Sequence, residues 1–419
     1  MPPTLFIASL LAALMLAATT AQAETLPGAS VESLLAAARE GSPELRIVNL
    51  EAEAARERIQ PAGALPDPVL RIELENLTRN GSQGATLDPR RVGDTKYTLM
   101  QPLPFWGKRN LKRELAASEA AQADGRRADT WAEIAARIKT LYAQYWLTSQ
   151  AVRLTRENIE LSRQLEQVAQ ARYAGGLAAQ QDAIRAQVER STLDAELIGM
   201  ESELHHLMSF MNAMLARPAN SALATPTSLR PLPAKLDAAT LSQRLQAANP
   251  QLAIEAARLD GAEKGRDLAY RNRYPDLTVG IAPMQVQNRV DAWSLMLEMN
   301  LPLQQGTRRS QERESERMLE AAAARREALG HRLHGELSAA LSELEAARQT
   351  EQISRSRLLP QAELTFKSAL AAYETGKVDF ATLLDAQRQI RNARLALLRA
   401  QASQQMRLAD IERLLGEDL

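Results

Sequence analysis

The sequence predicts a mainly α-helical protein with a small share of membrane β-strands, in which one unit of helix, strand, strand, long helix and helix occurs twice. The composition is rich in Ala, Leu, Glu, Arg and Gln and only 4% aromatic, which is typical of long packed helices. Residues 172–187 and 372–387 share Tyr, Gly and Ala-Gln at one offset of 200 residues, as between Tyr173 and Tyr373. Four short stretches alternate between apolar and polar residues, as strands do.

Charge and cysteine content argue against a nucleic-acid partner, a disulfide-bonded protein and a lipoprotein. Lys and Arg number 51 and Asp and Glu also 51, so no net positive charge favours a nucleic acid. Residues 1–23 resemble a secretory signal peptide, with an apolar run from Leu5 to Ala18 and small residues at Ala21 and Ala23; a retained N-terminal anchor is the alternative. An exported chain without cysteine has no disulfide and no lipidated Cys, which favours a Gram-negative periplasm or outer membrane.

The first structural repeat is expected over residues 24–216. Ser30 can cap an opening helix, which Pro43 interrupts. Residues 69–77 and 95–103 alternate in polarity and are expected to be strands. Residues 108–174 contain no proline and carry one apolar stripe, so they predict a continuous helix of roughly 100 Å.

That helix ends at a predicted hairpin tip, residues 173–177, where Gly175 and Gly176 can adopt the positive φ of a helix end. A return helix then runs to about residue 215, and residues 217–236 form a linker rich in Pro, Ser, Thr and Ala.

The second repeat, residues 237–419, follows the same plan. Its first helix is interrupted at Asn249-Pro250, and strands are expected at residues 277–287 and 292–301. A long helix is expected to be interrupted or kinked at Pro360 and to reach a second tip, residues 373–377, that turns at Gly376.

Strands of about ten residues have the length of tilted transmembrane β-strands. Four strands do not close a barrel, and an open edge in lipid leaves backbone groups unpaired. The chain is therefore expected to share a barrel with copies of itself, and three copies would give about twelve strands around an aqueous lumen. The polar residues of the strands would line that lumen, namely Arg71, Glu73, Glu75, Glu298 and Asn300.

These features resemble the TolC-like outer-membrane efflux channels over essentially the whole mature chain. The marks are the doubled Tyr-x-x-Gly tips, the repeated plan, and the segment QPLPFWGKR at residues 101–109, which looks most like the heavy-metal-efflux branch of the CzcC and CusC type. The resemblance implies a homotrimer, a twelve-stranded barrel in the outer membrane and a periplasmic coiled-coil tunnel. It also implies docking to a periplasmic adaptor, or membrane fusion protein, and to an inner-membrane RND pump.

The resemblance also implies a gate at the periplasmic aperture. Asp182 matches the family's acidic residue on the first hairpin, Tyr373 the tyrosine that hydrogen-bonds it, and Asp385 a pore-facing aspartate. The tip glycines Gly175, Gly176 and Gly376 would mark the surface that docks the adaptor or pump. Thr382 and Val378 depart from the family pattern, where an aspartate and an arginine are expected. The plainer interpretation is that both acids are ordinary surface residues and that Tyr373 packs.

The expected function is a passive duct that exports heavy-metal cations, with multidrug efflux or type I secretion as the alternative cargo. A periplasmic coiled-coil adaptor or structural protein is the alternative from another class. No enzyme motif occurs, and we expect no cofactor and no resident metal. His331 and His334 lack further ligands, and the stretch that contains Met200, Met208, Met211 and Met214 has the helical spacing of a packed core.

Overall fold

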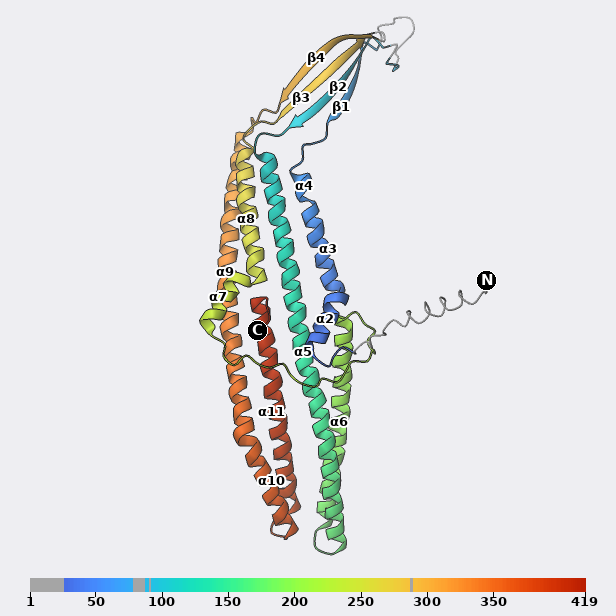
Figure 1. Cartoon of the computed structure of the whole chain (residues 1–419), viewed down its shortest axis with the longest axis vertical. Helices are drawn as coiled ribbons and strands as arrows, with labels where there is room; N and C mark the ends of the chain where they lie inside the picture. Colours follow the sequence, from blue (N-terminus) through green and yellow to red (C-terminus); the bar gives the residue numbers. More distant parts are fainter. Residues whose placement is uncertain (1–25, 78–86, 90–91, 287–288) are drawn as a thin grey trace, which may run out of the picture.

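A computed structural model describes residues 26–77, 87–89, 92–286 and 289–419. The expected signal peptide and the loop 78–86 lie outside these residues. Figure 1 shows an elongated molecule with a β-sheet at one end, two helical hairpins at the other, and helices running between them. Within the part of the chain that is described, no helix has the length and the apolar run needed to cross a membrane.

The first helices follow local signals in the sequence. Helix α2 (Val31–Gly41) is capped by the hydroxyl of Ser30, which accepts from the amide of Ser33. Ser42 then ends α2 and caps α3 (Pro43–Glu57), whose first residue is the expected interrupting proline. The short helix α4 (Ile59–Ala62) leads to the sheet.

The sheet contains four antiparallel strands in the order β1-β2-β3-β4: β1 (Val69–Glu75), β2 (Asp94–Leu103), β3 (Leu277–Val286) and β4 (Arg289–Met299). The first strand is shorter than expected, and the fourth begins and ends earlier. Strands β2 and β3 come from different halves of the chain and pair along their length. The outer edges of β1 and β4 pair with no other described strand.

The two faces of the sheet differ in polarity. One face carries a cross-strand row in which Leu70 pairs with Leu99, Leu99 with Ile281, and Ile281 with Leu295. All four side chains are exposed to solvent in the single chain. Because successive residues of a strand alternate between faces, the intervening charged residues lie together on the opposite face. One face of the sheet is therefore suited to lipid and the other to water.

The first hairpin is built from α5 (Lys108–Ala174) and α6 (Gln180–Met214). With 67 residues, α5 is roughly 100 Å long, and its bounds are those expected from the absence of proline. Ile134, Ile138 and Tyr142 of α5 pack against Met211 of α6 and Leu34 of α2 in one core cluster.

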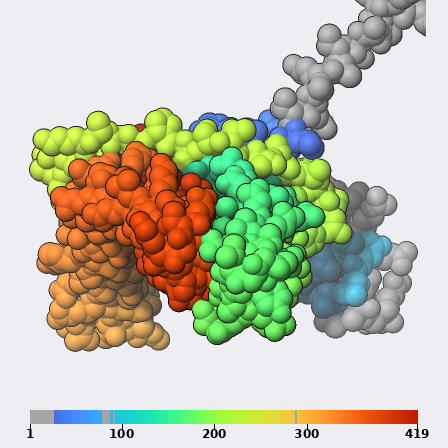
Figure 2. Space-filling model, turned by 90° about the horizontal axis from the view of Figure 1, so that it is seen from below, coloured from blue at the N-terminus to red at the C-terminus, as the bar shows by residue number. Residues whose placement is uncertain are grey.

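The second half contains α7 (Ala238–Ala248), α8 (Pro250–Arg271), α9 (Gln305–Ile353), a π-helical turn η2 (Ser354–Leu358), α10 (Leu359–Glu374) and α11 (Phe380–Leu415). The expected interruption at Pro360 takes the form of this π-helical turn. Proline has no N–H to donate and its ring crowds the preceding turn, so the helix widens just before it. Figure 2, seen from below, shows the tips of the two hairpins side by side, with the linker along one side.

A buried ion cluster joins this linker to the helices. Lys139 Nζ of α5 lies 2.7 Å from Glu412 Oε2 of α11, and each residue is 3% exposed. Arg230 of the linker donates two hydrogen bonds of 3.0 Å to the two carboxylate oxygens of Glu412. Asp418, beside the chain end, also pairs with Lys139.

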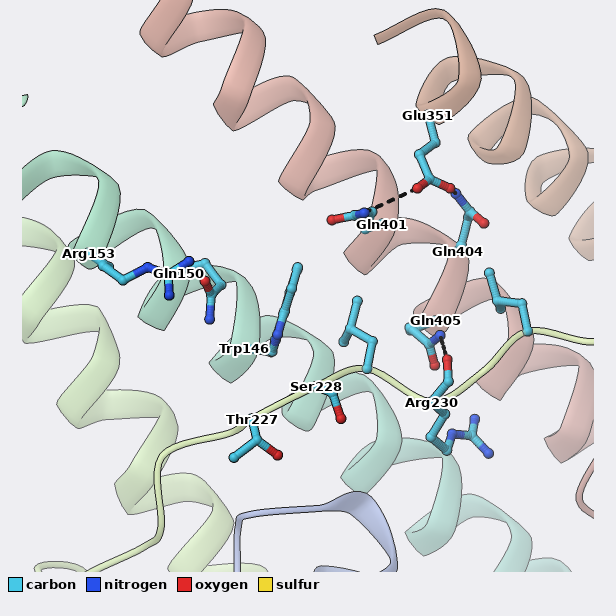
Figure 3. Close-up of a pocket in the computed structure, with 12 residues that line it drawn as sticks. Trp146, Gln150, Arg153, Thr227, Ser228, Arg230, Glu351, Gln401, Gln404 and Gln405 are labelled. Atoms are coloured by element: carbon cyan, nitrogen blue, oxygen red, sulfur yellow. Dashed lines mark hydrogen bonds between the residues drawn. The ribbon is translucent and has the colours of Figure 1, made fainter. Parts of the chain in front are cut away.

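A polar cavity of about 430 Å³ lies next to this cluster, between α5, α11 and the linker (Figure 3). Gln401 and Gln404 of α11 donate to the carboxylate of Glu351 on α9, and Gln405 donates to the backbone oxygen of Arg230. These hydrogen bonds connect three segments that are far apart in sequence.

We expect Glu412→Ala to destabilise the protein by about 3–5 kcal/mol, because Lys139 and Arg230 would lose their shared buried carboxylate and Lys139 would keep only the exposed Asp418. The measurement is the denaturant midpoint of the helical circular-dichroism signal. Glu160→Ala is the matched control, since Glu160 is exposed on α5 and makes no ion pair with any described residue. Equal midpoints for the two variants would contradict a stabilising role for the cluster.

Candidate gate at the hairpin tips

The two tips have the same backbone geometry. Gly176 and Gly376 have φ values of 70° and 73°, a region that favours glycine. At each tip an amide bonds a carbonyl five residues back, from Leu177 to Arg172 and from Lys377 to Ala372, both at 2.8 Å. This pattern closes a helix C-terminus and satisfies its last carbonyls. The glycines that the repeat singled out therefore lie at the turning points, with Gly175 beside Gly176 as the C-cap of α5.

Tyr373 is the residue around which the second tip packs. It is 3% exposed and belongs to an apolar cluster with Phe380, Leu383 and residues of the first hairpin. Its ring centroid lies 5.4 Å from that of Phe380. The cluster therefore joins the two hairpins at their ends.

The expected hydrogen bond from Tyr373 to Asp182 is not present. Tyr373 Oη is buried and has no hydrogen-bond partner among the described residues. Burial raises the pKa of Tyr373; Arg172 opposes this effect, and the charge of Asp182 adds to it. The structure thus brings Asp182 close enough to influence the phenol electrostatically, but without a hydrogen bond to its hydroxyl.

Arg172 makes the contact that sequence reasoning missed. From the end of α5 its Nη1 donates to the backbone oxygens of Tyr373 (2.9 Å) and Glu374 (3.1 Å). Its guanidinium carbon also lies 4.8 Å from the centroid of the Tyr373 ring. The carbonyls at a helix C-terminus lack intrahelical partners and carry partial negative charge, so they attract a cation. Arg172 therefore links the first hairpin to the second through the backbone of α10.

Two ion pairs reinforce this link farther from the tips. Arg388 Nε of α11 donates to Glu189 Oε2 of α6 at 3.0 Å, and Arg391 Nη1 lies 3.0 Å from Glu196 Oε2 on the same two helices. Glu189 is buried, which strengthens a charge-assisted bond. We call Arg172, Glu189, Glu196, Arg388 and Arg391 the inter-hairpin latch.

The remaining gate candidates lie apart from the latch. Asp385 is exposed on α11, and its carboxylate accepts from the amide of Gln389 at 2.8 Å. Thr382, at one departure from the family pattern, donates its amide to Asp379 Oδ1 (2.9 Å) and so completes the N-cap of α11. Val378, at the other departure, packs against the apolar cluster.

Four of the five predicted lumen residues share one face of the sheet, and the fifth, Asn300, follows the end of β4. Arg71 pairs across strands with Thr98, Glu73 with Lys96, and Lys96 in turn with Met284. Glu75 lies two residues after Glu73 and therefore on this same face. Glu298 also lies on it, because Glu298 pairs with Thr278 and Thr278 with Pro102, four residues after Thr98.

The histidine and methionine stretches have structural surroundings. His334 contacts Ser242 Oγ and Gln246 Nε2, each at 3.1 Å. His331 lies on the surface near Glu327. Met211 is buried in the core cluster of the first hairpin, and Met208 and Met214 pack against it. Across the described ranges, no three or more His, Cys, Asp or Glu residues gather as a metal site.

Part of the latch carries a signal in the sequence. Glu189 lies 13 residues after Gly176 and Arg388 lies 12 after Gly376, so opposite charges occur at nearly equal heights on the two hairpins. Arg172 has no such signal, because the repeat places Ala372 at the equivalent position of the second tip.

Comparison with known proteins identifies relatives over most of the chain. A family model described as outer membrane efflux protein matches residues 34–206 and 241–417. The cobalt-zinc-cadmium resistance protein CzcC of Cupriavidus metallidurans is 23% identical over 391 residues, which cover 92% of this chain and 90% of CzcC. A membrane protein from Pseudomonas aeruginosa superposes with a TM-score of 0.80 at 18% identity, covering 94% of this chain and 92% of that protein. CusC superposes with a TM-score of 0.79 at 18% identity, covering 92% of each chain.

We expect Arg172→Gln to loosen the second tip. Charge-assisted hydrogen bonds contribute about 1.5–3 kcal/mol, so amide hydrogen exchange over residues 372–379 should quicken by about ten- to a hundredfold. Arg163→Gln is the control, because Arg163 is exposed on the same helix and has no ion pair with any described residue. The proposed link fails if both variants exchange at the wild-type rate.

Proposed function

The chain belongs to the outer membrane efflux protein family, and we propose that it forms the passive outer-membrane duct of a tripartite, RND-type efflux system. The family makes it an outer-membrane channel protein and not an enzyme or a periplasmic adaptor. The predicted likeness to TolC-like channels of the CzcC and CusC type is confirmed.

The unpaired edges of the four-stranded sheet support a trimer most directly. Strands β1 and β4 run in opposite directions, so β4 of one copy can pair antiparallel with β1 of the next around a ring. Two copies would give about eight strands, whose interior side chains fill, whereas three give about twelve and leave a lumen. The apolar row that includes Leu99 and Ile281 would then face lipid, and Arg71, Glu73, Glu75 and Glu298 would face the water-filled interior.

The hairpin tips would form the periplasmic aperture. In a trimer, three copies of the exposed Asp385 would repel one another and attract cations around the axis. The inter-hairpin latch would hold the closed arrangement through Arg172 and the backbone of Tyr373, with Asp182 as a nearby charge. The adaptor or pump would dock at the turns formed by Gly175, Gly176 and Gly376 and open the aperture by separating the hairpins.

Heavy-metal cations are the proposed cargo. The likeness to CzcC, a cobalt-zinc-cadmium resistance protein, supports this choice, and so do the carboxylates on the polar face of the sheet. A duct imposes little selectivity of its own, so drugs or secreted protein remain the alternative cargo. The transport energy would come from the pump.

Deleting the gene should make cells sensitive to cobalt, zinc or cadmium. The measurement is the minimal inhibitory concentration for a panel of metals, beside detergents, dyes and antibiotics. Complementation by the wild-type gene is the control. Sensitivity confined to organic compounds would overturn the metal cargo and leave the duct intact.

We expect Arg172→Ala to raise the closed-state conductance of the channel in planar bilayers. The loss of about 1.5–3 kcal/mol should increase the open population by about ten- to a hundredfold while openings remain rare. Tyr373→Phe should change conductance little, because the phenol oxygen bonds to no described residue. If Tyr373→Phe raised the conductance and Arg172→Ala left it unchanged, a hydrogen bond from the Tyr373 hydroxyl would hold the gate instead.

A further inference from the structure

An apolar groove lies where the sheet meets the helices. Its volume is about 480 Å³, and no carboxylate is among the described residues that line it. Its apolar lining is Leu65, Leu103, Phe105, Trp106, Leu277 and Met299. We call it the collar groove.

The collar groove continues the apolar face of the sheet. Leu103 pairs with Leu277, and Leu277 with Met299, so these three form the last cross-strand row of that face. The row lies next to the first turn of α5, where the chain leaves the sheet. The acyl chain of a lipid that lies along the sheet would thus end in this groove.

Aromatic residues stand at the mouth of the collar groove. Phe105 stacks on Tyr274 with ring centroids 4.5 Å apart, and Trp106 meets Phe105 edge-on at 6.0 Å. Trp106 is nevertheless 83% exposed. An amphipathic ring left open at the end of an apolar surface is typical of the boundary between lipid tails and headgroups.

One arginine lines the collar groove and a second lies beside its wall. Arg109 lines the groove, and its Nε donates to the backbone oxygen of Gly63 at 2.9 Å, while its terminal nitrogens bond to no described residue. The guanidinium carbon of Arg271 lies 3.6 Å from the place where Gly107 would carry a Cβ, against the groove wall. The side chain of Arg271 makes no hydrogen bond or ion pair with any described residue, and its backbone oxygen accepts from the amide of Tyr274 at 3.1 Å.

Asp276, the residue after the groove-lining Pro275, is an acidic group that is already engaged. Asp276 Oδ1 accepts from Lys108 Nζ and from the amide of Phe105, both at 2.8 Å. It therefore leaves the two arginines unneutralised. Guanidinium groups bind phosphate oxygens in paired, charge-assisted hydrogen bonds.

We propose that the collar groove binds one anionic phospholipid from the periplasmic leaflet of the outer membrane. The acyl chain lies along Leu103, Leu277 and Met299, Trp106 lies at the glycerol level, and Arg109 and Arg271 bind the phosphate. The proposal rests on insertion of the sheet in the outer membrane. It does not depend on which substrate the channel exports.

The test is native mass spectrometry of the full-length protein purified in neutral detergent, with phosphatidylglycerol or phosphatidylcholine added. The wild-type protein should retain about one phosphatidylglycerol per chain and prefer it about tenfold over phosphatidylcholine. Arg109→Ala with Arg271→Ala should bind it at least about tenfold more weakly, since charged hydrogen bonds are lost. Arg317→Ala, an exposed residue of α9, is the control and should bind as wild type does.

Three results would overturn the proposal: equal retention of the two lipids, an unchanged affinity in the double variant, or displacement of the lipid by millimolar inorganic phosphate. A photo-crosslinking residue in place of Trp106 tests the occupant in intact cells. A lipid adduct supports the assignment. An adduct with another protein chain overturns it, even if the purified double variant folds poorly.

Discussion

The exposed edges of a four-stranded sheet are the constraint on which the rest of this structure depends. Each edge presents backbone N–H and C=O groups that lipid cannot satisfy, so the sheet is complete only as part of a closed ring. Duplication of the unit supplies two strand pairs per chain, and the pairing of β2 with β3 joins the two halves within one sheet. Because both long hairpins then leave the sheet at the same end, they lie side by side down to their tips.

Polar interactions hold the helical part at two levels. At mid-length, Glu412 forms ion pairs with Lys139 and Arg230 in a buried cluster that joins the linker to α5 and α11. At the tips, Arg172 reaches the open end of α10, and ion pairs join α6 to α11. The middle cluster is buried and fixed, whereas the arginines of the tip contacts are partly exposed. The same kinds of charged residue therefore make a buried contact in one place and a partly exposed contact in the other.

Local chemistry made most of the fold predictable from sequence. The absence of proline defined α5, glycine marked both tips, and alternation marked the strands. Contacts between distant segments were not predictable in this way. Arg172 binds backbone oxygens, which every residue carries, so the type of residue gives no sign of this contact. The glutamines that bind Glu351 have the spacing of any polar helix residue. The expected hydrogen bond between Tyr373 and Asp182 came from the family resemblance, whereas in the structure the Tyr373 hydroxyl is buried without a partner among the described residues.

The π-helical turn before Pro360 gives the second hairpin an irregular helix that the first hairpin lacks. α5 and α6 are each uninterrupted α-helix, whereas the second hairpin descends through a widened turn into α10, an arm of 16 residues or roughly 24 Å. A bend of about 10° at that turn would carry the end of this arm sideways by about 4 Å, about the width of one side chain. The return helix α11 is uninterrupted as well, so a bend at this turn would slide α10 along α11 and leave the other three hairpin helices unchanged.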